Sequence, residues 1–117
     1  MSDSLAKALR FIKELQKLDP SLTIACAHTL LLAAKHEGRT ISYIVKQSSV
    51  SKSTVCRYIQ DLGETRVLKR VGGKGPAAGP GLLITRDQLE DRREKEVFLT
   101  ARGRALMAAI EEIMGRP

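Results

Sequence analysis

Hydrophobic side chains recur at helical spacing in the first third of the chain. A stripe of five aliphatic residues opens it, at Leu5, Leu9, Ile12, Leu15 and Leu18. This helix ends at Asp19-Pro20, because a residue that precedes proline avoids helical backbone angles. A second helix is predicted over residues 21–37. It is apolar on most of its sides, which indicates that it lies at the centre of the core.

The segment 40–63 contains two shorter amphipathic helices separated by a polar turn. The first helix ends before a pair of serines that forms the turn, and Ser51 is a suitable N-cap for the second. The buried side of the second helix carries Val55, Ile59 and Leu62. Two short helices joined by a tight turn, with a polar outer face on the second, predict a helix-turn-helix.

After Gly63 the pattern changes from helical to alternating. Strands are predicted over residues 66–71 (RVLKRV), 82–85 (LLIT) and 96–100 (EVFLT). Thr100 is placed to cap a last helix over residues 101–114. The order of elements predicts an α+β fold that is mainly α, a winged helix-turn-helix with a small antiparallel β-wing. We expect one such domain over residues 1–117.

The stretch GGKGPAAGPG, residues 72–81, interrupts this pattern. It lacks the first glycine and the Ser or Thr of a phosphate-binding P-loop, and its two prolines oppose a following helix. A domain linker is also excluded, since the strands after it are needed to complete the fold. We interpret it as an extended loop of the wing. Two arrangements stay open: one long wing over 66–100, or a hairpin of 66–71 with 82–86 followed by a charged loop.

Basic charge is concentrated in the middle of the chain. The sequence has 20 Lys and Arg against 13 Asp and Glu, a formal net charge of +7. Residues 41–75 hold seven of the basic side chains and two of the acidic ones, so +5 of the +7 lies there. Such an excess indicates a surface that faces a polyanion. A solvated basic face would carry the same charge, so charge alone does not decide between the two.

The second helix of the helix-turn-helix has a polar face suited to the major groove of DNA. Its exposed side is predicted to carry Lys52, Ser53, Cys56, Arg57 and Gln60. The guanidinium of Arg57 can read a guanine edge through two hydrogen bonds, and Lys52 and Ser53 can reach bases or phosphates. Hydroxyl groups and the N-terminal amides of the helix suit phosphate oxygens. The predicted DNA-binding residues are Ser51, Lys52, Ser53, Thr54, Arg57 and Tyr58.

Two segments resemble known DNA-binding regulators. Residues 51–57 (SKSTVCR) are similar to the S-x-x-T-V-S-R core of many bacterial repressor helix-turn-helix units, with Cys56 where serine is commoner. Residues 91–106 (DRREKEVFLTARGRAL) resemble the D-R-R-x-x-x-V-x-L-T-x-x-G-R-x-L segment of MarR-family winged-helix regulators. The resemblance runs from about Leu22 to Leu106. It implies a homodimer whose recognition helix enters the major groove of double-stranded DNA, with the wing over the adjacent minor groove or backbone.

The resemblance also implies roles for residues of the wing. In the family, the Asp and the second Arg of this motif stabilise the wing, so Asp91 and Arg93 would form the stabilising pair. A wing Arg enters the minor groove, where negative potential is concentrated. The predicted DNA contacts of the wing are Lys74, Arg86, Arg92 and Arg93.

The two terminal helices, residues 1–18 and 101–114, are predicted to contribute to the dimer interface. Their apolar stripes are Leu5, Leu9, Ile12 and Leu15 in the first helix and Leu106, Ile110 and Ile113 in the last. The alternative is that both stripes pack on the core of their own subunit.

Family members enclose a pocket for small phenolic ligands between long terminal helices. These helices are shorter here, which argues against such a pocket, and a small-molecule effector is kept only as an alternative.

Other chemistries have little support in the sequence. The candidate metal ligands Cys26, His28 and His36 follow no CxxC or HxxxH pattern, so we expect no metal and no cofactor. Cys56 has no visible partner cysteine for a redox switch. No arrangement of a nucleophile and a base stands out, so we do not expect an enzyme.

We expect a cytoplasmic, nucleoid-associated protein, because the N-terminus turns amphipathic at once and no apolar run reaches the about 18 residues of a membrane span.

The leading hypothesis is a repressor that binds a palindromic operator as a homodimer. Two alternatives stay open. One is a partition or architectural protein that coats repeated sites on a plasmid or phage genome. The other is a winged-helix protein-interaction module without a DNA role, against which the basic middle third argues.

Overall fold

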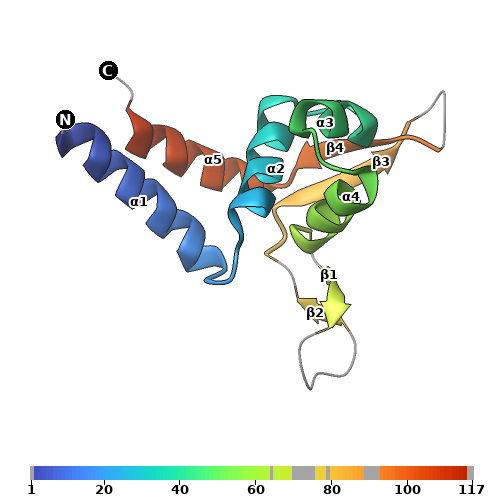
Figure 1. Ribbon diagram of the computed structural model, residues 1–117, viewed down its shortest axis with the longest axis horizontal. Coiled ribbons are helices and arrows are strands. Elements are labelled where there is room, and N and C mark those ends of the chain that lie inside the picture. The colour runs from blue at the N-terminus through green and yellow to red at the C-terminus, as the bar shows by residue number, and fades with distance from the viewer. Residues whose placement is uncertain (1, 64, 70–75, 79, 89–92, 116–117) are drawn as a thin grey trace.

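The computed structural model describes residues 2–63, 65–69, 76–78, 80–88 and 93–115. They form α1 (Ser2–Leu18), α2 (Ile24–Lys35), α3 (Ile41–Ser48), α4 (Lys52–Asp61), β1 (Thr65–Lys69), β2 (Pro76–Ala78), β3 (Leu83–Asp87), β4 (Lys95–Leu99) and α5 (Ala101–Met114). In Figure 1, α1 and α5 lie side by side and extend away from a body built from α2, α3, α4 and the β3–β4 pair. The predicted α+β class with mainly helical content is confirmed.

Hydroxyl side chains begin four of the helices. Thr23, Thr40, Ser51 and Thr100 each accept a hydrogen bond from the backbone amide three residues later, at 3.1, 3.1, 3.3 and 3.0 Å respectively. These bonds satisfy amides that have no partner within the helix. The N-caps predicted at Ser51 and Thr100 are therefore confirmed.

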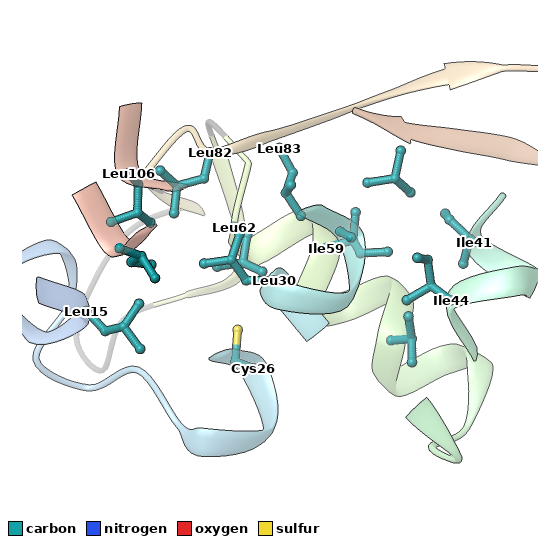
Figure 2. Close-up of a cluster of buried hydrophobic side chains, with 14 residues drawn as sticks. Leu15, Cys26, Leu30, Ile41, Ile44, Ile59, Leu62, Leu82, Leu83 and Leu106 are labelled. Carbon is teal, nitrogen blue, oxygen red and sulfur yellow. The ribbon is translucent and has the colours of Figure 1, made fainter. Parts of the chain in front are cut away.

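The core is built from side chains of each helix, α1 to α5, and of the β3–β4 pair (Figure 2). The largest of the fully buried hydrophobic side chains are Leu30, Ile44, Val55, Leu62, Leu82 and Val97. The second predicted helix is central as expected, because Cys26, Leu30 and Ala33 on one side of α2 are all buried. Its apolar character extends to the surface, however, since Ile24 is 86% exposed.

The β3–β4 pair is antiparallel, with Leu83 opposite Leu99 and Asp87 opposite Lys95. β4 also meets the segment that precedes α3. The amide of Gly38 donates to the carbonyl of Val97 at 2.8 Å, and the amide of Val97 donates to the carbonyl of Arg39 at 3.0 Å. These bonds fix the wing strands against the helix-turn-helix.

The strand pairing departs from both arrangements predicted for residues 66–100. β1 pairs with β2 and not with residues 82–86, while β3 and β4 form a separate sheet. Residues 76–78, predicted as part of a loop, form β2, and its proline is tolerated as the first residue of an edge strand. β3 packs on the core through Leu82 and Leu83, which are buried at its start, and it does not pair with β1.

Candidate nucleic-acid interface

A tight turn sets the angle between α3 and α4. Ser49 has a φ of 59°, in the left-handed region, and its amide donates to the carbonyl of Val45 at 3.0 Å. The hydroxyl of Ser48 is buried, donates to the same carbonyl at 3.0 Å and accepts from the amide of Val50 at 3.1 Å. Two serines thus satisfy the backbone groups that the end of α3 leaves open, and the predicted polar turn is confirmed.

α4 buries one side and exposes the other. Its exposed residues, with the N-cap, are Ser51, Lys52, Ser53, Arg57 and Gln60. Val55 and Ile59 on the opposite side lie in the core. The prediction was wrong for Cys56, which is half-buried and packs against the core. It follows Val55 directly and lies at the edge of the buried side.

Two of the six residues predicted to contact DNA from α4 are less exposed than the other four. Thr54 is half-buried, and its hydroxyl accepts a hydrogen bond from Ser51 Oγ at 2.9 Å. Tyr58 is half-buried against the core and lines a cavity of about 270 Å³ together with Leu22 and Asp61. The other four, Ser51, Lys52, Ser53 and Arg57, are exposed.

The wing strands carry charges of both signs. Arg86 is exposed, and its guanidinium carbon lies 4.8 Å from the centroid of the Phe98 ring. Lys95 Nζ lies 2.6 Å from Asp87 Oδ1, across the strand pair. Arg93 is exposed as well. The other residues predicted for the wing, Lys74, Asp91 and Arg92, lie outside the described residues.

Glu94 has no signature in the sequence, yet it joins the wing to both helices of the helix-turn-helix. Its carboxylate accepts a hydrogen bond from Ser42 Oγ on α3 at 3.1 Å and lies 3.9 Å from Lys52 Nζ on α4. Its backbone carbonyl accepts from the amide of Gln88 at 3.0 Å. Because Ser42 and Glu94 are 52 positions apart, only the folded chain brings them together.

A second carboxylate, that of Glu37, connects the end of α2 to β4 and α5. It accepts hydrogen bonds from both terminal nitrogens of Arg104, at 2.9 and 2.5 Å, and from the amide of Leu99 at 2.9 Å. Burial raises the pKa of Glu37, but the bonds from Leu99 and Arg104 outweigh it and lower this pKa below its ordinary value. The charged carboxylate thus stabilises the corner where β4 leads into α5.

The predicted dimer stripes have different surroundings. On α1, Leu5, Leu9 and Ile12 are 65%, 63% and 43% exposed. The remaining residues are buried within the chain itself, at Leu15, Leu106, Ile110 and Ile113. An apolar groove of about 520 Å³ between α1 and α2 continues the exposed surface, and its lining includes Phe11 and Ile24. The exposed part of the predicted interface therefore belongs to α1.

Within the described ranges, no three side chains of His, Cys, Asp or Glu are grouped so that they could hold a metal ion. None of the helices formed by these residues combines the length and the apolar character needed to cross a bilayer.

Known structures share this geometry. No family model matches the sequence, and no curated protein matches it. The crystal structure of MarR has a TM-score of 0.64 at 24% identity, over 96% of this chain and 70% of that one. The complex of S. aureus MepR with DNA has a TM-score of 0.63 at 25% identity, over 92% and 72%. CouR, a transcriptional repressor bound to a 23-mer DNA duplex, has a TM-score of 0.59 at 22% identity, over 91% and 66%.

These likenesses each cover more than nine tenths of the chain, so they include both the helix-turn-helix and the β3–β4 wing. The order of elements and the pairing of β3 with β4 agree with the winged-helix class expected from the sequence. The chain has the fold of the MarR-type winged-helix regulators.

Proposed function

We propose that this protein binds double-stranded DNA sequence-specifically and acts as a homodimeric transcriptional regulator, a repressor of genes beside its sites. The observation that carries the proposal is the open face of α4. Ser53, Arg57 and Gln60 follow one another at helical spacing on that face, and all three are exposed. Side chains of this kind, on the exposed face of a helix, are suited to hydrogen bonds with base edges in the major groove.

Electrostatics supports the same orientation. Lys52 lies in the first turn of α4, at the end of the helix where unpaired amides favour anions. Arg86 is exposed on the neighbouring wing. The excess of +5 in residues 41–75 adds a long-range attraction for a polyanion. The likeness to MepR and CouR, which were both solved with DNA, agrees with this partner.

The homodimer is proposed from the surface of α1. Leu5, Leu9 and Ile12 are aliphatic, exposed and on successive turns of one helix. A contiguous apolar surface of this kind favours burial against a partner, and a second copy offers the same surface through a two-fold axis. A dimer of this symmetry binds two half-sites on one face of the duplex, about 34 Å or a multiple of it apart.

The test begins with selection of genomic fragments by the purified protein, which supplies a bound duplex. Affinity for that duplex is then compared between wild type, Arg57→Ala and a control, Arg10→Ala, whose side chain is exposed on α1. We expect Arg57→Ala to lose about 1–3 kcal/mol on the selected site and to discriminate less between sequences, while the control binds as wild type. Unchanged affinity and preference in Arg57→Ala would exclude α4 as the recognition helix.

The same selection separates regulation from partition. One palindrome upstream of a gene supports the repressor, whereas an array of repeated sites would favour an architectural role. Salt dependence provides a further check on the duplex itself. If about six phosphates are contacted, affinity falls on the order of 10³-fold between about 50 and 200 mM salt. A flat response to salt would contradict duplex binding.

A further inference from the structure

The exposed polar side chains of α4 fall within a narrow sector of the helix. Each residue is rotated by about 100° from the one before it, so Arg57 lies about 40° to one side of Ser53 and Gln60 about 20° to the other. The buried residues Val55 and Ile59 point the opposite way. Ser53, Arg57 and Gln60 therefore point in nearly the same direction, away from the core.

Arg57 and Gln60 differ from the first turn of α4 in their surroundings. There, Lys52 Nζ lies 3.9 Å from a carboxylate oxygen of Glu94 on the wing. By contrast, no hydrogen bond or ion pair in the described part of the chain involves the guanidinium of Arg57 or the side-chain amide of Gln60. The polar atoms of these two side chains are thus left for water or for a ligand.

Both side chains also have space beside them. α4 lies next to β3 (Figure 1), and Gln60 lines a hollow of about 280 Å³ between the two elements, together with Thr85. Arg57 lines the cavity of about 270 Å³ toward the turn between α1 and α2, together with Asp61. Packing therefore leaves each planar polar group free to rotate into line with a base edge.

The two polar groups match different bases. A guanidinium has only donors, so Arg57 is suited to two hydrogen bonds with the O6 and N7 acceptors of guanine. A side-chain amide has a donor and an acceptor next to each other. Adenine presents the complementary pair in the major groove, an N6 amino donor beside the N7 acceptor, whereas guanine presents two acceptors and cytosine and thymine one polar group each. Gln60 is therefore matched to adenine.

The spacing along α4 relates the two bases to each other. Three residues advance a helix by about 4.5 Å, while successive base pairs of a duplex are about 3.4 Å apart. When α4 lies along the groove, Arg57 and Gln60 thus face base pairs that are one or two steps apart. The seven residues from Ser53 to Gln60 cover about 10.5 Å, or about three steps, so the whole face falls within one half-site.

We propose that Gln60 is a specificity-determining residue, which reads an adenine within two base pairs of the guanine read by Arg57 in each half-site. The amide nitrogen of Gln60 donates to adenine N7 and its oxygen accepts from the N6 amino group, so this position requires an A·T pair. The inference rests on the proposed function, since it requires that α4 enter a major groove. It goes beyond that function by naming two bases of the site and the side chain that selects each.

Selection from a pool of random duplexes tests the assignment. The purified wild type, Gln60→Ala and Arg57→Ala each yield a consensus, and urea unfolding checks the fold of each variant. We expect Gln60→Ala to lose its preference at one A·T pair of each half-site, and Arg57→Ala to lose it at a G·C pair one or two steps away. The matched control is Gln47→Ala, which removes an exposed glutamine from α3 and should select the wild-type consensus.

Titration of single duplexes measures the contact itself. Replacing the A·T pair by G·C should weaken wild type about 5- to 150-fold, the value of one bidentate contact. The same change should alter the affinity of Gln60→Ala by less than about twofold. Adenine is then replaced by 7-deazaadenine, which lacks N7 but still pairs with thymine. Losing this one hydrogen bond should weaken wild type about 2- to 12-fold and leave Gln60→Ala unchanged.

The outcomes separate the role of Gln60 from the proposed function. If wild type selects no sequence, the proposed function fails and the role of Gln60 fails with it. If wild type selects a site and Gln60→Ala selects the same one, the role of Gln60 alone is overturned. It is also overturned if the relaxed pair is not A·T, if it lies more than two steps from the pair relaxed by Arg57→Ala, or if 7-deazaadenine weakens wild type and Gln60→Ala equally.

Discussion

Replacing Glu37 with alanine should destabilise the fold, because it removes one carboxylate that lies outside the proposed DNA-binding surface. The side chain accepts hydrogen bonds from the amide of Leu99 and from both terminal nitrogens of Arg104. It thereby connects the end of α2 to the corner between β4 and α5. Glu37→Ala removes all three acceptor contacts, whereas Glu37→Gln keeps one neutral oxygen for the Leu99 amide.

The size of the effect follows from the surroundings of each partner. The Leu99 amide is part-buried, and leaving such a donor without an acceptor costs about 1–3 kcal/mol. Arg104 is 59% exposed, so its ion pair with Glu37 contributes at most about 1 kcal/mol. We therefore expect Glu37→Ala to lower the free energy of unfolding by about 2 kcal/mol, with the backbone contact as the larger part. Glu37→Gln should lower it by about 1 kcal/mol.

The pH dependence has a definite sign. The pKa of Glu37 is lower in the folded protein than its ordinary value of 4.5, which we take for the unfolded chain. Stability from the charged carboxylate is then fully present above pH 4.5 and is lost as the pH falls through the folded pKa. Wild type and Glu37→Gln should differ in urea unfolding at neutral pH and converge in acid. Protein concentration is held constant, because the proposed dimerisation would link stability to concentration.

Arg104→Ala is the matched comparison, since it removes the ion pair and leaves the Leu99 bond in place. It should cost less than about 1 kcal/mol. The reasoning is refuted if Arg104→Ala costs as much as Glu37→Ala, or if the difference between wild type and Glu37→Gln is the same at every pH.

Three further predictions concern packing, assembly and charge. Gly103→Ala should lower the free energy of unfolding in urea by about 2 kcal/mol, because a Cβ there would collide with the carbonyl oxygen of Leu82. Leu5→Glu combined with Leu9→Glu should yield folded monomers in sedimentation equilibrium, since the proposed dimer would bury two unpaired carboxylates from each subunit. Glu94→Gln should tighten binding to random-sequence DNA by up to about fivefold in a fluorescence titration, because it removes a negative charge beside Lys52.

Each of these has a control. Ala105→Gly, at an exposed position of α5, should cost about 1 kcal/mol, and a Gly103→Ala protein as stable as wild type would contradict the close approach of α5 to Leu82. Lys13→Glu should leave the dimer intact, and a wild type that is monomeric at micromolar concentration would refute the assembly. Ser42→Ala keeps the charge of Glu94, so its affinity should change by less than about twofold; an effect equal to that of Glu94→Gln would point to wing position instead of charge.

The helices of this protein could be predicted from sequence because their determinants are local. Ser51 and Thr100 cap the residues directly after them, and the spacing of Val55 and Ile59 places them together on one side of α4. Arg57 falls on the opposite side by helix geometry alone, so the exposed face of the candidate site was predictable as well. Cys56 was not, since a residue at the edge of the buried side can lie in either environment.

Strand pairing and long-range polar contacts were decided by the tertiary structure. Every strand offers the same backbone groups, so alternation along residues 66–71 predicts a strand without naming its partner, and β1 pairs with β2. The apolar stripes of α1 and α5 look alike in sequence, yet Leu106 is buried and Leu5 is exposed. Which stripe meets the core, and which carboxylate meets Ser42 or Arg104, depends on segments far apart in the chain, and these become neighbours only when the core closes.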